Sequence, residues 1–191
     1  MDNRYDCDQE NACRLALTDP DYKVRYDAVL KVIDEEVLKQ VVLLDKSALL
    51  RRVAVHNIAD EKVLWQVVFN DVDPDVRGEA VIRISDQGIL KTVILFESDP
   101  LVRSEAVYKV TDEKFLTCIA LGDEDWVTRK AAVCNIDNEE VLKQIAVFDS
   151  EAEVRRVAIF KLRDQETLRK IAASDSDYEL KLIAISKLQK K

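Results

Sequence analysis

Glycine, proline and histidine are scarce in this chain of 191 residues, which contains three, three and one of them respectively. So few turn-forming residues argue against a turn-rich all-β fold and against a glycine-rich phosphate loop. The single histidine, His56, has no partner at a defined spacing, which argues against a histidine-based metal site or a catalytic base. Because G-x-S-x-G and H-E-x-x-H motifs are also missing from the sequence, we predict that the protein is not an enzyme.

Paired cysteines and long apolar runs are missing as well. Cys7, Cys13, Cys118 and Cys134 form no C-x-x-C pair, so we expect reduced, mostly half-buried thiols and no cofactor. No apolar run approaches the ~20 residues that span a bilayer. The start, MDNRYDCDQE, lacks the basic flank and apolar stretch of a signal peptide. We therefore expect a cytoplasmic protein with no membrane partner.

Positive charge is in deficit, because 37 acidic residues outnumber 29 basic ones and the net charge is −8. This balance argues against sequence-independent binding to nucleic acid. Apolar residues make up 48% of the chain. That fraction suffices for a sizeable core, so the charge does not indicate disorder.

The main positive signal is an internal repeat of 26 residues without insertions. An arginine recurs at this step from residue 25 to residue 155, and Lys181 continues the series. Three residues after each comes an alanine, and the next position is always Val or Ile. The alanine column contains Ala28, Ala54, Ala80, Ala106, Ala132, Ala158 and Ala184.

The spacing inside the repeat predicts two helices. Counted from the arginine, apolar columns fall at −1, +3, +4 and +7 and again at +13, +16 and +17, which is the stripe of an α-helix. The L-x-L alternation of a leucine-rich-repeat strand is absent. We expect helices of roughly 9–12 residues, and N-caps for the first helix of each pair. These caps are Asp8, Asp34, Asp60, Asp86, Asp112, Asn138 and Asp164.

Stacking follows from the size of one helix pair, which cannot cover its own apolar stripe. We therefore predict an all-α protein, an α-solenoid of about seven two-helix repeats that runs from about residue 8 to residue 189. Residues 1–191 then form a single domain. The alanine column suits this arrangement because a methyl side chain lets neighbouring helices approach closely.

The motif D-x-D-x-x-V-R-x-x-A-V, present at residues 71–81, resembles the short HEAT-like repeats, including the bilin-lyase type and the helical leucine-rich repeat variant. The resemblance covers essentially the whole chain and implies a HEAT-like solenoid. The repeat variant can carry a cysteine-ligated iron–sulfur segment, but Cys7 and Cys13 are too few for the usual four thiolates. The family serves scaffolds, adaptors, chaperone-like subunits and a few enzymes.

The resemblance also implies a structural Asp–Arg ladder that ties each layer to the next, with the guanidinium bound to carboxylates and turn carbonyls. An acidic residue stands six positions before each arginine, with Glu97 replacing Asp in one repeat. A stripe that binds a ligand is the weaker alternative. The ladder residues are Asp19, Arg25, Asp45, Arg51, Asp71, Arg77, Arg103, Asp123, Arg129, Asp149 and Arg155.

Two columns of the second helix, at +1 and +5, vary in size and chemistry between repeats, as recognition of an irregular partner would require. In HEAT-like proteins the second helices line the concave surface, so this strip is the candidate groove, although half-buried packing explains column +5 equally well. Gly78 leaves a gap in the strip. The candidate partner-binding strip comprises Tyr26, Leu30, Arg52, His56, Ile82, Tyr108, Lys130, Arg156 and Phe160.

We predict a non-enzymatic scaffold, a monomer that binds a protein or peptide through this concave face. One alternative is a lyase-like or chaperone-like subunit that handles a chromophore, with help from the Cys134 thiol. Nucleic-acid binding or base excision is a third possibility, and it needs a basic strip inside an acidic protein. That strip would contain Lys31, Arg52, Arg83, Lys109, Lys130, Arg156 and Lys161.

Overall fold

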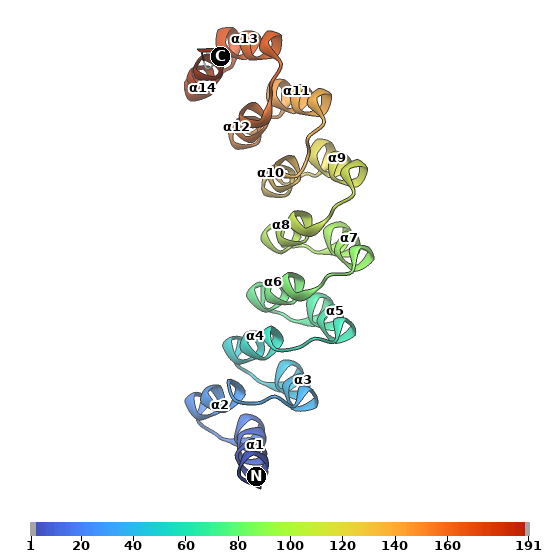
Figure 1. The fold of residues 1–191 in the computed structure, drawn as a ribbon, viewed down its shortest axis with the longest axis vertical. Helices are drawn as coiled ribbons and strands as arrows, with labels where there is room; N and C mark the ends of the chain where they lie inside the picture. Colours follow the sequence, from blue (N-terminus) through green and yellow to red (C-terminus); the bar gives the residue numbers. More distant parts are fainter. Residues whose placement is uncertain (1–2, 190–191) are drawn as a thin grey trace. The chain divides into compact units, whose positions relative to one another are not determined.

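The computed structural model describes residues 3–189, and the side chains of residues 8–189. Over this range the chain forms α-helices joined by short turns, with no strand (Figure 1). The helices are α1 Asn3–Thr18, α2 Tyr22–Val29, α3 Glu35–Leu44, α4 Ala48–His56, α5 Glu61–Asn70, α6 Pro74–Arg83, α7 Gln87–Phe96, α8 Pro100–Lys109, α9 Glu113–Gly122, α10 Trp126–Cys134, α11 Glu139–Phe148, α12 Ala152–Lys161, α13 Gln165–Ser174 and α14 Tyr178–Gln189.

The chain divides into two compact units, residues 1–106 and residues 107–191, which we call unit 1 and unit 2. The boundary falls inside α8. In unit 1, α3 packs against α4 and α5 against α6, and α4 contacts both α2 and α6. In unit 2, α11 packs against α12 and α13 against α14, and α12 contacts both α10 and α14. Each unit is therefore a stack of helix pairs, the arrangement of an α-solenoid.

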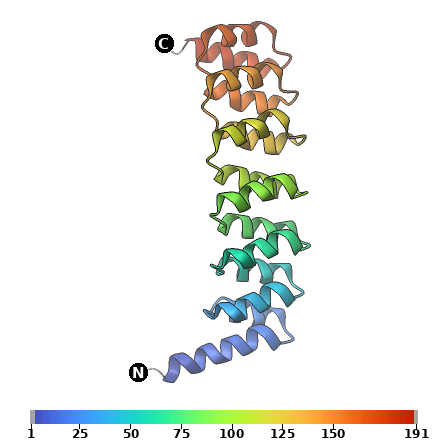
Figure 2. The ribbon, with the colours of Figure 1, turned by 90° about the vertical axis from the view of Figure 1, so that its right-hand side faces the viewer.

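The 26-residue period is reproduced in the helices. The first helices α3, α5, α7, α9, α11 and α13 are each ten residues long, and their first residues are 26 positions apart. Figure 2 shows the first helices of each unit lying one after another. The predicted N-caps of these six helices are confirmed, because each side chain accepts a backbone N–H of the first turn, as Asp34 does from Glu36 and Val37.

The predicted cap Asp8 is wrong. Helix α1 begins at Asn3 and continues through Asp8 to Thr18, so it is 16 residues long. Asp8 therefore lies inside the helix and not at its start. The first-helix pattern simply extends toward the N-terminus by one and a half turns.

The predicted apolar columns form the core. All seven residues of the alanine column are buried, with at most 4% of their surface exposed. Leu64 and Leu90 from the first helices and Ile58 and Ile84 from the turns after the second helices are almost completely buried. Every second helix therefore contributes one closely packed methyl side chain, and each first helix from α3 to α13 contributes one buried leucine, whereas α1 has Ala12 at the equivalent position.

The acidic residue that follows each of α3, α5, α7, α9 and α11 has extended backbone angles. Asp45 follows α3 and Asp71 follows α5 in this conformation. Asp45 Oδ1 accepts the backbone N–H of Ser47 at 2.8 Å, and Asp71 Oδ1 accepts that of Asp73 at 2.9 Å. This local turn competes with continued helix and turns the chain into the second helix.

Within residues 3–189, no helix combines the length and the apolar character that a membrane span would need.

Candidate functional site

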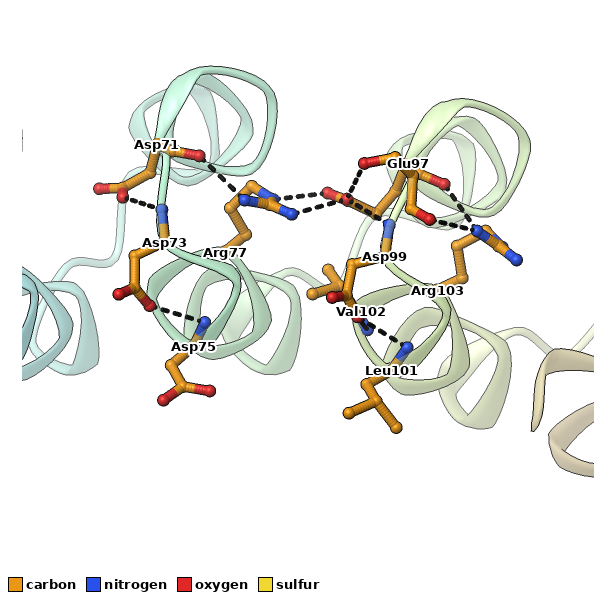
Figure 3. A network of polar contacts seen from close by, with 10 residues as sticks. Asp71, Asp73, Asp75, Arg77, Glu97, Asp99, Leu101, Val102 and Arg103 are labelled. Carbon is orange, nitrogen blue, oxygen red and sulfur yellow. Dashed lines mark hydrogen bonds and ion pairs between the residues drawn. The ribbon is translucent and has the colours of Figure 1, made fainter. Parts of the chain in front are cut away.

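The arginine of one layer bridges to the acidic residue that ends the next first helix, 20 positions further along the chain. Arg77 Nε and Nη2 donate to the two carboxylate oxygens of Glu97 at 2.9 and 3.0 Å, and Arg77 Nη1 donates to the carbonyl of Asp71 at 3.1 Å (Figure 3). The same two-pronged geometry joins four further pairs. They are Arg25–Asp45, Arg51–Asp71, Arg129–Asp149 and Arg155–Asp175.

The acidic residue six positions before each arginine contributes its backbone carbonyl to that arginine. Asp19 and Asp123 accept in this way from Arg25 and Arg129, both at 3.0 Å. Arg103 Nη1 likewise donates to the carbonyls of Glu97 and Ser98 at 3.0 Å. One guanidinium therefore holds the turn of its own layer by a carbonyl and the turn of the next layer by a carboxylate.

The ladder is buried, and its electrostatics favour the charged forms. The side chains of Arg51 and Asp71 are 11% and 7% exposed. Burial by itself raises the pKa of Asp71, but hydrogen bonds from Arg51 and from the Asp73 N–H outweigh it, so the pKa lies below its ordinary value. The hydrogen bond to Asp71 raises the pKa of Arg51. The pKa values of Asp45 and Asp175 are lowered for the same reasons.

A second set of ties between layers starts at the first residue of the first helices. Glu61 Oε1 accepts the backbone N–H groups of Ser85 and Asp86 in the next turn, at 2.6 and 3.3 Å. Glu35, Glu113 and Glu139 do the same for the turns 24 and 25 residues further on. The sequence suggests only a favourable charge at the helix N-terminus. The structure adds that the same carboxylate satisfies backbone donors of the next layer.

Lysines six residues after Arg155 and Lys181 supply a third set of ties in unit 2. Lys161 Nζ donates to the carbonyl of Cys134 at 2.6 Å, and Lys187 Nζ donates to that of Ile159 at 2.9 Å. Desolvation lowers the pKa of Lys187. These lysines cap the C-terminus of the preceding second helix, which carries partial negative charge. The ammonium groups of Lys161 and Lys187 therefore stabilise contacts between layers.

Four large apolar or aromatic members of the candidate strip are exposed. Leu30 and Ile82 in unit 1 are 56% and 51% exposed, and Tyr108 and Phe160 in unit 2 are 47% and 59% exposed. Tyr26 and Lys130 are half-buried. Within each unit, Figure 1 places the second helices on one side of the stack and the first helices on the other. Large apolar side chains at these positions are thus available to a partner.

Three charged members of the strip, Arg52, His56 and Arg156, contact the layer that follows, whereas Lys130 contacts a residue of its own helix. His56 Nδ1 lies 2.9 Å from Glu79 Oε1, and Arg52 Nη1 lies 3.8 Å from Asp75 Oδ2. In unit 2, Arg156 Nη2 lies 2.8 Å from Glu153 and 3.5 Å from Glu179. Lys130 Nζ stacks over the Trp126 ring at 5.0 Å from its centroid. Unlike the ladder, these contacts are solvated and varied.

A hollow interrupts the strip of unit 1 at Gly78. It has a volume of about 380 Å³ and lies against α4, α6 and the start of α8. An ideal Cβ built on Gly78 would meet no atom within 4 Å, so the hollow is open directly above the glycine. Its lining combines apolar and acidic groups. The lining residues are Arg52, Pro74, Asp75, Gly78, Glu79, Ile82, Asp99, Leu101, Val102, Ser104 and Glu105.

The C-terminal ends of the first helices expose apolar side chains that the core columns do not include. Leu44 and Phe96 in unit 1 are 75% and 73% exposed, and Phe148 in unit 2 is 78% exposed. The signal was present in the sequence, because residues 41–44, 93–96 and 145–148 are four apolar residues in a row, whereas a helix stripe buries only part of such a run. Within each unit, hollows lie between the C-terminal ends of neighbouring first helices, and ladder residues line them.

The cysteines are reduced in the part of the chain whose side chains are described. Cys13 is half-buried, and desolvation raises its pKa. Cys118 and Cys134 are exposed, so the expectation of mostly half-buried thiols is wrong for both of them. Cys7 lies outside the described side chains. Over residues 8–189, no group of three or more His, Cys, Asp or Glu side chains could hold a metal ion.

In comparisons with known proteins, no family model, no curated protein and no solved structure matches the chain.

Proposed function

We propose that the protein is a non-enzymatic interaction module that binds a protein or peptide segment along its second-helix face. One observation carries the proposal. The columns that stack the layers are uniform and buried, whereas columns +1 and +5 vary and keep large apolar side chains exposed, including Leu30, Ile82 and Phe160. Exposed aromatic and aliphatic anchors beside charged groups are the composition of protein interfaces. The resemblance to HEAT-like repeats supports the same function.

The frame is suited to binding because its buried ties between layers are made by residues outside the strip. The Arg–carboxylate pairs and the glutamate ties hold the turns at the two ends of the helices. The strip residues lie between these ties on the outer surface of the second helices. Substitution in the strip should therefore change recognition without loss of the fold.

The test is a peptide-display selection on the wild-type protein, followed by affinity measurements with the selected peptides. A variant of the strip, Leu30→Ser with Ile82→Ser, is compared with a matched variant of the first helices, Leu43→Ser with Leu95→Ser. The four side chains are similar in size and are 51–59% exposed. The control therefore removes as much exposed apolar surface as the strip variant.

We expect the strip variant to lose affinity by about tenfold or more and the first-helix variant to keep it, because interface anchors dominate affinity. In unit 2, Tyr108→Ala with Phe160→Ala should weaken binding to that part of the strip with little change in thermal stability. Retained affinity in both strip variants, or a selection that enriches no peptide, would overturn the proposal.

A further inference from the structure

Gly78 is a glycine without a structural reason. It lies in the interior of α6, where glycine costs about 1 kcal/mol relative to alanine. Its backbone does not have a positive φ, and no neighbouring atom approaches the place of a Cβ within 4 Å. Neither backbone geometry nor packing therefore requires a glycine. Local choices that cost stability without structural need are typical of functional positions.

The missing side chain opens the hollow above α6, and the hollow has an unbalanced charge. Four carboxylates line it, from Asp75, Glu79, Asp99 and Glu105, and Arg52 is the one Lys or Arg among the described residues that line it. Glu79 also contacts His56, and Asp99 also accepts the backbone N–H of Leu101. Arg52 lies 3.8 Å from Asp75, a loose pair in which the Asp75 side chain is 79% exposed. The hollow therefore presents net negative charge to anything that enters it.

The wider surface of unit 1 has the same sign. Residues 1–106 contain 21 Asp and Glu against 14 Lys and Arg, a net charge of −7, whereas residues 107–191 contain 16 against 15, a net charge of −1. Almost all of the net negative charge of the chain, −7 of −8, is therefore carried by the unit that contains the hollow. Such a field favours approach of a cationic partner.

The rim of the hollow also offers apolar contacts. Ile82 and Leu101 are 51% and 65% exposed, and both line the hollow beside Gly78. A side chain with an aliphatic stem and a charged end fits this combination, because Arg and Lys bury their stems along apolar surface while the head group meets carboxylates. The larger hollow at the ends of α1 and α3 does not offer the same site for a cation. It is lined by Arg25 and Asp45, and the Asp45 carboxylate is already paired with Arg25.

We propose that the Gly78 hollow of unit 1 binds a cationic peptide segment, with an Arg or Lys side chain laid across Gly78 toward the carboxylates and an apolar neighbour against Ile82 and Leu101. The inference rests on the proposed function and specifies the chemistry of its partner. The peptide is an extended or helical segment in which basic and apolar residues alternate.

The experiment measures fluorescence anisotropy of a labelled peptide of alternating Arg and Leu, at an ionic strength of about 0.15 M. A matched peptide carries citrulline for each Arg, which keeps the shape and removes the charge. Gly78→Leu fills the hollow at constant charge. Gly122→Leu is its control, because Gly122 is also helical and its Cβ would also meet no atom within 4 Å.

We expect Gly78→Leu to weaken binding of the Arg peptide by about tenfold or more, Gly122→Leu to leave it within about twofold, and the citrulline peptide to bind at least about tenfold more weakly to the wild type. Glu105→Gln should weaken binding more than Glu10→Gln, an exposed substitution of equal charge change in α1. Equal effects of the two glutamine variants would indicate attraction by net charge only and would overturn the inference.

The outcomes separate this inference from the proposed function. Peptides that bind the second-helix face while Gly78→Leu has no effect on the Arg peptide would overturn the inference and leave the proposed function standing. If both strip variants, Leu30→Ser with Ile82→Ser and Tyr108→Ala with Phe160→Ala, also kept their affinity for the selected peptides, the proposed function would be overturned as well. Circular dichroism of each variant shows that it is folded, which Gly78→Leu should favour because leucine is the better helix former.

Discussion

Arg51 and Asp71 belong to successive layers, and their side chains meet in a two-pronged ion pair, with 2.7 Å from Nε to Oδ2 and 2.8 Å from Nη2 to Oδ1. Both side chains are nearly buried. Removal of one partner leaves a buried charge without its counter-ion. We predict that Arg51→Met lowers the free energy of unfolding by about 3 kcal/mol, measured by urea denaturation.

The neighbouring residue supplies the control. Arg52 is 45% exposed at its side chain, and its closest acidic partner is 3.8 Å away. Arg52→Met should change the free energy of unfolding by less than about 1 kcal/mol, because exposed pairs contribute little. Similar losses in the two variants would contradict a structural role for the ladder.

The ladder also predicts how stability depends on pH. The pKa values of Asp45, Asp71 and Asp175 are lowered in the folded protein, so the unfolded chain binds more protons than the folded one in acid. Stability from these groups is complete above their ordinary pKa of about 4 and is lost as pH falls through the lower folded values. Urea denaturation at a series of pH values measures this slope.

Asp71→Asn and Arg51→Met should each flatten that acid limb, because either change removes the interaction that lowers the pKa of Asp71. A wild-type protein equally stable at about pH 5 and about pH 2.5 would show that the ladder carboxylates do not set the profile.

Two second helices have poor N-caps. Ser47 before α4 and Glu151 before α12 make no side-chain cap hydrogen bond, whereas Asp73 before α6 accepts from the N–H of Asp75. Ser47→Asp should raise the free energy of unfolding by about 0.5 kcal/mol, and Asp73→Ala should lower it by about 1 kcal/mol. Thermal denaturation of both variants tests the pair, and a loss in Ser47→Asp would contradict it.

Thr128 occupies a core column that is valine at the equivalent positions 76, 102 and 154. It is completely buried, and its hydroxyl has no hydrogen-bond partner. Thr128→Val keeps the shape and removes the buried hydroxyl, so it should stabilise the protein by about 1 kcal/mol. Val154→Thr in the same unit is the reciprocal change and should destabilise by a similar amount in calorimetry. If Val154→Thr stabilised the protein, a buried hydroxyl in this column would not be destabilising, and the prediction would be wrong.

The helical period and the core were predictable because they follow from one-dimensional spacing. Ala80 and Leu90 are buried where the columns place them, since a helix turn converts a step of three or four into a common face. The start of α1 was not predictable from Asp8, because the cap position recurs with the 26-residue period but the helix continues through it to Asn3. The 26-residue spacing does not predict how far a helix extends beyond the repeating positions.

The contacts between layers were less accessible to sequence reasoning. The sequence spacing does not show that the Glu61 carboxylate accepts the N–H groups of Ser85 and Asp86. Whether this contact forms depends on the distance between successive layers. The hollow at Gly78 likewise depends on how Leu101 and Ile82 lie around it. The variable strip could be named from the sequence, but its shape and the balance of its charges required coordinates.

The most direct test of binding through the second-helix face is photo-crosslinking with a selected peptide that carries a benzophenone side chain, followed by mass spectrometry of the attachment sites. The account predicts that in unit 1 the attachment sites lie on α4, α6 and the start of α8, around Ile82 and Leu101, which are exposed there. Attachment confined to the exposed ends of α3 and α7, at Leu44 and Phe96, would contradict it.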